Sequence, residues 1–324
     1  MCDHAGGGER AVVGVAIEDR WPYDSLVSFS DIASEVYGLY REGRFPDALA
    51  VVVEARPRHA SEDATLTFWE GCLLSVSGNP SGALAALQHG VSRGLWWSET
   101  MLGDSDLDQV RVFDGWSDFL EECERRAKRV AGSRPEVFAR PPVPPEAGVL
   151  VTLHGAHADP AEHARVWEAA APVEWMVITP VGTVPATVNR WSWPSTTVDS
   201  IAGVLDQLPS LDWDRRVVLG GFSQGGRVAL SLAERSPRPP EGLVLVAPAV
   251  QADALPPVPD VPTFFIVGER DWALPGVEAL ARVMTERGVP HVLDRRAGMD
   301  HVVPEDFGVV LPNALNWLST TPAV

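Results

Sequence analysis

The chain has 324 residues, of which 45% are hydrophobic and 22% are charged, and its formal net charge is −18. That length allows two domains, and the composition is that of an ordinary globular protein. There is no apolar run of the ~18 residues that a membrane span needs, and the first residues lack the pattern of a secretory signal. The acidic surface disfavours nucleic acids and anionic membranes as partners. We therefore expect a cytoplasmic protein without a membrane span.

The cysteines point to no metal or disulfide framework. Cys2, Cys72 and Cys123 are widely separated and lack the spacing of metal ligands. Three reduced thiols in a cytoplasmic protein are the simpler interpretation.

Residues 1–28 mix glycine, charge and one apolar stretch, and they fit either a flexible tail or a stray strand. From Phe29 the apolar residues Ile32, Val36 and Leu39 recur with helical spacing. A turn at Gly43 leads to a second helix, in which Pro46 is an early residue.

The same arrangement returns further along the chain. Gly43 and Gly78, and likewise Ala48 and Ala83, are separated by 35 positions. This offset is close to the ~34-residue period of tetratricopeptide helix pairs. Residues 29–130 are therefore predicted to form a small all-α, tetratricopeptide-like domain, a possible site for a protein partner. We expect the aromatic-rich segment 95–130 to supply its core and cap.

Residues 131–147 contain five prolines and little periodicity, which predicts a linker with one edge strand at 136–139. A linker of this kind carries few contacts, so residues 148–324 are expected to fold without the helical domain.

From Gly148 the chain alternates apolar runs with helical patterns, which is typical of a parallel sheet covered by helices. The predicted strands are 149–153, 175–179, 217–219, 243–246, 264–267 and 291–293, and the predicted helices are 162–170, 198–208, 227–234, 275–287 and 304–318. The fold class is α/β, and an active site is expected at the carboxyl ends of the strands.

One strand is followed directly by a glycine-flanked serine and a helix. Gly221, Ser223 and Gly225 form the pattern Gly-x-Ser-x-Gly. A turn this sharp needs neighbours that are almost free of side chains, and it lifts the serine hydroxyl above the sheet. The pattern predicts that Ser223 is a nucleophile.

The letters GFSQGG around Ser223 closely resemble the carboxylesterase and acyl-protein thioesterase group of α/β-hydrolases. The resemblance covers about residues 135–320. It implies the α/β-hydrolase fold, and with it a mostly parallel sheet that has helices on both faces. It also implies a triad in the chain order serine, acid, histidine.

Asp271 directly follows a predicted strand, in a stretch that resembles the family's Gly-x-x-Asp-x-x-Val-Pro. Leu274 replaces the valine, and Glu269 is the nearest rival acid. The other acids that follow Ser223 in similar loops are less well placed: Asp294, Asp300 and Asp306. Asp271 is the predicted acid.

Two histidines follow Ser223. His291 begins an apolar run and is predicted to lie in a strand. His301 lies between the last strand and the last helix, where the family places its base in a Gly-x-x-His loop. The resemblance therefore assigns the general base to His301.

Ester cleavage also needs donors for the developing oxyanion. The backbone N–H of Gln224 follows the nucleophile, and the resemblance of residues 153–155 to the family's Leu-His-Gly element indicates the N–H of Ala156. The chain departs from the family after Ala156, which could bring His157 to the mouth of the pocket. The further candidate substrate contacts are Trp191, Trp193 and Trp272. For Trp191 and Trp193, packing is an equal alternative.

These residues predict a serine hydrolase that cleaves a carboxylic ester or thioester through an acyl-enzyme, without a metal or organic cofactor. Its substrate is expected to be a small molecule or an acyl compound. The same triad would also serve an acyltransferase, a cyclase or an amidase. In a different class, the helical domain would be a partner-binding scaffold beside a vestigial hydrolase.

Overall fold

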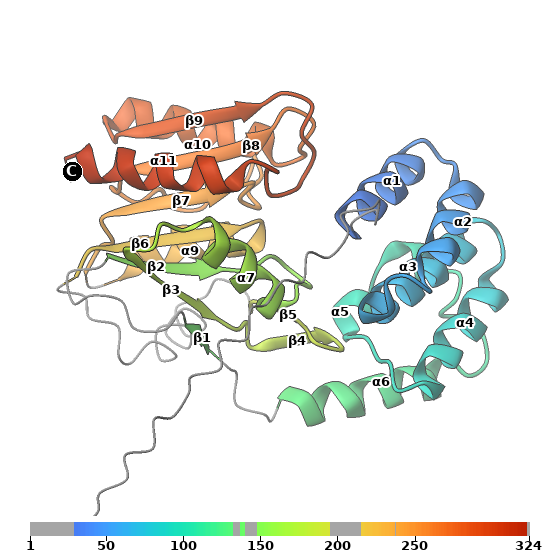
Figure 1. Cartoon of the computed structure of the whole chain (residues 1–324). Helices are drawn as coiled ribbons and strands as arrows, with labels where there is room; N and C mark the ends of the chain where they lie inside the picture. The colour runs from blue at the N-terminus through green and yellow to red at the C-terminus, as the bar shows by residue number, and fades with distance from the viewer. Residues whose placement is uncertain (1–28, 132–136, 140–147, 195–214, 237, 323–324) are drawn as a thin grey trace, which may run out of the picture.

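The computed structural model describes residues 29–131, 137–139, 148–194, 215–236 and 238–322. The first 28 residues, most of the proline-rich linker and the helix expected at 198–208 lie outside the described residues. Figure 1 shows a helical region, coloured blue to green, beside a region built on one large sheet.

The helical region begins with two helix pairs. The first pair is α1 (Phe29–Arg41) and α2 (Phe45–Ala55), and the second is α3 (Asp63–Val76) and α4 (Pro80–Ser92). The turns between the paired helices contain Gly43 and Gly78, with φ of +71° and +85°. Glycine adopts these angles without strain, so the repeated glycine of the sequence marks a repeated turn. The predicted pairs of helices are therefore present, while their tetratricopeptide character stays a prediction.

The aromatic-rich segment supplies much of the core of this region. It contains α5 (Glu99–Leu102), a 3-10 turn at Ser105–Leu107 and α6 (Trp116–Ala131). A second 3-10 turn, at Ala60–Glu62, precedes α3. Trp97 is fully buried, and its Nε1 donates a hydrogen bond of 2.9 Å to the backbone oxygen of Ala64. Trp116 and Phe119 of α6 pack in the same cluster. The expected core role is confirmed for Trp97, Trp116 and Phe119, whereas Phe113 is exposed and the role as a cap stays a prediction.

The sheet has the strand order β1-β3-β2-β6-β7-β8-β9. Its strands are β1 (Val137–Ala139), β2 (Gly148–Leu153), β3 (Trp175–Pro180), β6 (Val217–Phe222), β7 (Gly242–Val246), β8 (Thr263–Gly268) and β9 (His291–Arg296). β1 runs antiparallel to β3 at one edge, and the other neighbouring strands are parallel. Each strand predicted from the sequence is present.

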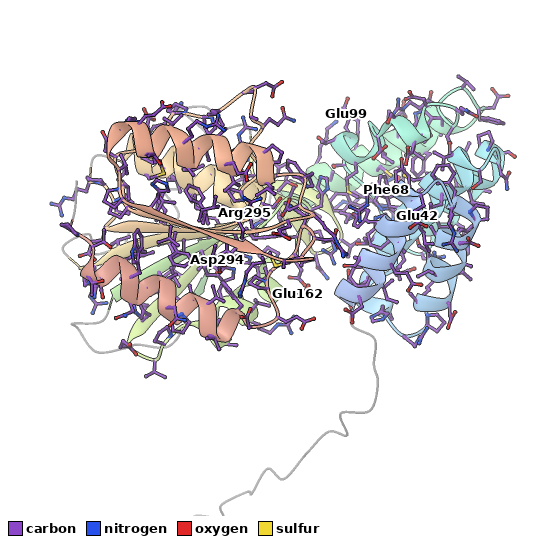
Figure 2. All side chains as sticks on the ribbon, turned by 90° about the horizontal axis from the view of Figure 1, so that it is seen from above. Glu42, Phe68, Glu99, Glu162, Asp294 and Arg295 are labelled. Atoms are coloured by element: carbon purple, nitrogen blue, oxygen red, sulfur yellow. The ribbon has the colours of Figure 1, made fainter. Side chains whose placement is uncertain are left out.

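Two layers of helices cover the sheet (Figure 2). α9 (Gln224–Arg235) and α10 (Leu274–Arg287) share a core cluster on one face. α7 (Pro160–Ala170) and α11 (Phe307–Thr320) share a separate cluster on the other face. This arrangement places the carboxyl ends of β6 and β8 next to each other across β7. Among the described helices, none is long and apolar enough to cross a membrane.

A hairpin that the sequence did not predict joins the two regions. Its strands β4 (Val184–Thr187) and β5 (Arg190–Ser192) pair antiparallel. Ala186 is 1% exposed and belongs to the same core cluster as Trp97. The N–H of Ser98 donates to the oxygen of Ala186 over 2.7 Å. The regions therefore share a core through a hairpin far from the linker, and these contacts count against the expected independent folding of residues 148–324, which stays a prediction.

Candidate active site

Ser223 occupies a sharp turn between β6 and α9. Its φ of +52° and ψ of −118° are unusual for a residue with a side chain. A Cβ on Gly225 would come within 1.9 Å of the oxygen of Leu153, and one on Gly221 would come within 2.5 Å of the backbone of Gly225. The backbone of Ser223 is held by hydrogen bonds with Val246 and Ala249. These contacts support a strained backbone and show why both flanking positions are glycine.

Ser223, His301 and Asp271 form one hydrogen-bonded chain. The Nε2 atom of His301 lies 2.9 Å from the Oγ of Ser223. Its Nδ1 atom lies 2.8 Å and 3.0 Å from the two carboxylate oxygens of Asp271. Because a carboxylate only accepts, Nδ1 carries the proton and Nε2 is free to accept the serine proton. This is the geometry of a nucleophile, a base and an orienting acid.

Asp271 is well placed to hold His301. The residue is 4% exposed, and its Oδ1 also accepts a hydrogen bond of 2.8 Å from the N–H of Ala273. Three of the rival acids are engaged elsewhere: Asp294 and Asp306 pair with Arg296, and Asp300 pairs with Arg41. Glu269 is exposed. His291 lies in β9, as expected, and its Nδ1 contacts the backbone of Val289.

The loop between β2 and α7 is anchored by His154, for which sequence analysis assigned no role of its own. The His154 ring is fully buried; its Nε2 accepts a hydrogen bond of 2.9 Å from the N–H of Gly182, and its Nδ1 lies 2.8 Å from the oxygen of Gly155. Burial lowers the pKa of His154 to about 4. A neutral ring that carries its proton on Nδ1 satisfies both contacts. His154 thus fixes the backbone next to Ala156.

His157 bends the same loop. It has a φ of +53°, and its N–H donates a hydrogen bond of 3.0 Å to the hydroxyl of Ser192. Its oxygen accepts from Arg190 over 3.0 Å, and burial lowers the pKa of its ring. Ala156 and His157 both line a cavity together with His301. Both residues therefore lie at the same cavity as His301, while their roles toward a substrate stay predictions.

Gln224 fixes the loop on the other side of the serine. Its Nε2 donates to the oxygen of Trp193 and its Oε1 accepts from the N–H of Trp193, both over 3.1 Å. Gln224 is also the first residue of α9, and the first N–H groups of a helix have no partner within it. The N–H of Gln224 therefore lies beside Ser223 and has no acceptor within the helix.

The three candidate tryptophans have different environments. Trp193 is 3% exposed, and its Nε1 donates to the oxygen of His154 over 2.7 Å. Of the two roles left open for Trp193, substrate contact and packing, its burial and this hydrogen bond favour packing. The backbone N–H and oxygen of Trp191 are both hydrogen-bonded to the backbone of Ala158, which joins β5 to the loop between β2 and α7. Trp272 is 55% exposed, and the centroid of its ring lies 5.0 Å from that of His301. It lines a cavity with His301.

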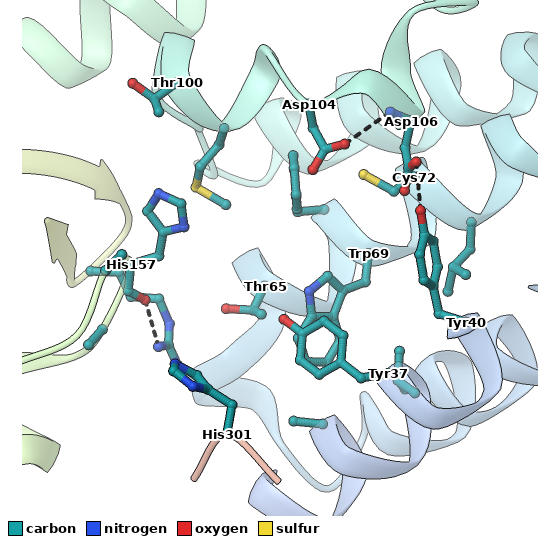
Figure 3. Close-up of a pocket in the computed structure, with 18 of the residues that line it drawn as sticks. Tyr37, Tyr40, Thr65, Trp69, Cys72, Thr100, Asp104, Asp106, His157 and His301 are labelled. Atoms are coloured by element: carbon teal, nitrogen blue, oxygen red, sulfur yellow. Dashed lines mark hydrogen bonds between the residues drawn. The ribbon is translucent and has the colours of Figure 1, made fainter. Parts of the chain in front are cut away.

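Two cavities meet at His301. The larger has a volume of about 630 Å³ and is lined by Ala156, His157 and Phe222 of the sheet region and by side chains of α1 and α3 (Figure 3). The smaller has about 430 Å³ and is lined by Tyr37, Arg41 and Trp272 among others. The helical-region residues at these cavities were not predicted from the sequence, because no local pattern shows that α1 faces His301. Within the described ranges, no group of His, Cys, Asp and Glu side chains is placed to hold a metal ion.

The N-terminal region matches a known family. Residues 29–131 match the family model described as "A/B hydrolase-like, N-terminal domain". A search of curated proteins returned no match.

Several solved structures are similar to this chain. An uncharacterized protein from Bacillus cereus is 17% identical with a TM-score of 0.47, and the match covers 90% of this chain and 100% of the other. The Bacillus cereus carboxylesterase is 16% identical with a TM-score of 0.46, over 58% of this chain and 95% of its own. Zea mays acyl-protein thioesterase 2 is 16% identical with a TM-score of 0.43, over 57% of this chain and 98% of its own.

The fold can be assigned from the chain itself. The parallel sheet has helices on both faces, the serine lies on a tight turn after a central strand, and acid and histidine follow in that order. The resemblance to α/β-hydrolases predicted from the sequence is confirmed: the chain has an α/β-hydrolase fold, and the helical region before it matches the A/B hydrolase-like N-terminal domain.

Proposed function

We propose that the protein is a serine hydrolase that cleaves a carboxylic ester or thioester. The observation that carries this proposal is the hydrogen-bonded chain of Ser223, His301 and Asp271 at the mouth of a cavity. A serine hydroxyl is a poor nucleophile unless a neighbouring base takes its proton, and His301 is at hydrogen-bonding distance to do so.

In the acylation step, the Oγ of Ser223 attacks the substrate carbonyl carbon while its proton moves to the Nε2 of His301. The carbonyl oxygen becomes an oxyanion, and the N–H groups of Ala156 and Gln224 donate hydrogen bonds to it. The bond to the leaving group then breaks, and the alcohol or thiol takes the proton from His301. Asp271 remains ionised and stabilises the imidazolium formed during attack.

In the second step, a water molecule gives a proton to His301 and attacks the acyl-enzyme. The acid is released, and the Oγ of Ser223 recovers its proton. An amine or alcohol in place of this water would make the enzyme an acyltransferase. Product analysis with and without such a nucleophile distinguishes the two outcomes.

The proposal is tested with a fluorophosphonate probe, which reacts with activated serines. We expect the wild-type protein to be labelled and to hydrolyse 4-nitrophenyl acetate, and Ser223→Ala to lose both properties. Ser81→Ala, which removes an exposed hydroxyl from α4, is the matched control. Absence of labelling in folded wild-type protein would contradict a working triad and would favour the scaffold alternative.

A further inference from the structure

The larger cavity runs from the triad into the helical region. Figure 3 shows His301 and His157 at one end, Asp104, Asp106 and Tyr40 at the other, and the rings of Tyr37 and Trp69 between them. Its volume of about 630 Å³ lies within the range of small-molecule sites, ~300–1,000 Å³. Most of the residues that line it belong to the helical region, which precedes the hydrolase fold in the chain.

The two cavities at His301 differ in what else they contact. Ala156 and Phe222 line the larger cavity, while Trp272, Arg41 and Arg270 line the smaller one. The proposed oxyanion donor Ala156 lines only the larger of these two cavities, whereas the proposed proton donor His301 lines both. The larger cavity is therefore assigned to the acyl group, and the smaller cavity to the leaving group that takes its proton from His301.

We propose, on the basis of the proposed function, that the cavity formed by α1, α3 and the 154–158 loop is the acyl pocket. It selects medium-length apolar acyl groups that carry no negative charge at their far end. The helical region is thus the specificity-determining part of the enzyme.

The character of the wall supports an apolar acyl group. The ring of Trp69 stacks with Phe29 at 5.6 Å between centroids and meets Tyr37 edge-on at 5.5 Å. Further apolar side chains of the wall are contributed by α1, α3 and α5: Ala33, Val36, Phe68, Leu73 and Met101. Burial of acyl methylenes against such a wall is favourable because it removes apolar surface from water.

The far end of the cavity determines the charge that the acyl group can carry. Asp104 and Asp106 lie there, and the hydroxyl of Tyr40 donates a hydrogen bond of 2.8 Å to the Oδ1 of Asp106. Among the described lining residues, the one arginine is Arg190, which contacts His157 at the other end and pairs with Glu62. A terminal carboxylate or phosphate would therefore meet two acids and no free base, which disfavours it.

The first experiment fills the cavity. Thr65 is half-buried on α3 and lines it, so Thr65→Trp places a large ring inside. We expect the ratio of kcat/KM for 4-nitrophenyl octanoate to that for the acetate to fall about tenfold or more. Ala85→Trp adds the same ring at an exposed position of α4 and should leave the ratio unchanged. Thr100→Trp, at an exposed residue of the cavity wall, is the second variant if Thr65→Trp does not fold.

The second experiment tests charge. The 4-nitrophenyl monoester of octanedioic acid matches the octanoate ester in length but ends in a carboxylate. We expect the wild-type protein to prefer the octanoate ester about tenfold or more in kcat/KM. The double variant Asp104→Asn, Asp106→Asn should lose most of that preference, while its octanoate to acetate ratio is retained.

Three results would overturn the proposal. The first is an unchanged octanoate to acetate ratio of kcat/KM in folded Thr65→Trp and Thr100→Trp. The second is that these variants instead lower kcat/KM for alkyl acetates as the alcohol becomes longer. The third is that the wild-type protein cleaves the charged ester and the octanoate ester with equal kcat/KM. Failure of the proposed function is distinct, because labelling and acetate hydrolysis would be absent from the wild type. In that case the acyl pocket is tested without catalysis, by calorimetry of octanamide binding to Ser223→Ala. Binding that becomes about tenfold weaker when Thr65→Trp is added supports the acyl pocket, and absent or unchanged binding overturns it.

Discussion

At the scale of single residues, Asp271 shows how strongly the fold constrains the hydrogen-bonded chain of Ser223, His301 and Asp271. Its carboxylate is buried, contacts the Nδ1 of His301 through both oxygens, and accepts a third bond from the N–H of Ala273. Since the N–H of Ala273 is two residues away, this contact fixes the carboxylate relative to its own backbone. The acid therefore orients the ring of His301 with little freedom to move.

Asp271→Asn should reduce kcat on the order of ~10⁴-fold, because an amide of the same size loses the charge and favours the wrong tautomer of His301. Steady-state hydrolysis of 4-nitrophenyl acetate measures the effect. Glu269→Gln, at the exposed acid two residues earlier, is the matched control and should retain nearly full turnover. If the folded Asp271→Asn protein kept wild-type turnover, the acid would be assigned wrongly, while the contact between Ser223 and His301 would stand.

At the scale of elements, the loop between β2 and α7 depends on buried polar contacts. His154 accepts from Gly182 after β3, and its own backbone oxygen accepts from the indole of Trp193 after β5. His154 thus connects three loops beside Ala156, through its imidazole to Gly182 and through its backbone oxygen to Trp193. Protonation of this ring would break the contact with Gly182, because both ring nitrogens would then be donors.

This contact predicts a loss of stability in acid. Because burial lowers the pKa of His154 to about 4, the unfolded state takes up a proton first as the pH falls below ~6.5. The contribution of His154 to stability is present above that pH and is lost as the pH falls toward 4. Between pH 7 and 5 the free energy of unfolding should fall by roughly 2 kcal/mol from this residue.

Urea unfolding at the two pH values measures this effect. His154→Gln keeps an acceptor for Gly182 but does not titrate, so its loss of stability between pH 7 and 5 should be smaller by about that amount. The carboxylates of the protein contribute equally to both proteins and cancel in the comparison. An identical pH dependence of the two would show that His154 is accessible or charged in the folded state.

At the scale of the whole molecule, the helical region and the sheet region form one folded unit. Glu62 and Arg190 form an ion pair between the regions, with side chains that are 11% and 15% exposed. The hydroxyl of Thr187 donates to the oxygen of Trp96, and Thr187 itself is buried. Arg41 of α1 reaches Asp300, the residue before His301. The helical region therefore contacts both the hairpin and the loop that carries His301.

A chain that begins at residue 132 should consequently be less stable and lose its preference for octanoate over acetate. It would expose Ala186 and Thr187 and leave Arg190 without its partner. Urea unfolding and the kcat/KM ratio measure the two effects. Glu62→Gln in the full chain is the milder variant: removing one member of a buried pair should cost about 3 kcal/mol. A truncated chain with full stability and an unchanged ratio would restore the independence expected from the linker.

The sequence by itself determined the local elements. The strands, the helix pairs and the serine turn follow from apolar periodicity and from glycine, which act over a few residues. Gly221 and Gly225 mark the serine turn in the sequence because a Cβ at either position would collide with backbone atoms. The order of Ser223, Asp271 and His301 was implied by the resemblance to α/β-hydrolases, and each of the three follows a strand whose carboxyl end faces the same edge of the sheet.

Only the tertiary structure decided which distant surfaces meet. Trp193 packs on His154, and a hairpin joins the two regions. Tyr37 and Trp69 line the same cavity as His301. Each of these arrangements brings together residues that are far apart in the chain. A tryptophan in a loop has the same local pattern whether it lines a pocket or fills a core, because burial depends on what the rest of the chain brings against it. The candidate residues Ser223, Asp271 and His301 could therefore be predicted from the sequence, whereas the shape of the cavity beside them could not.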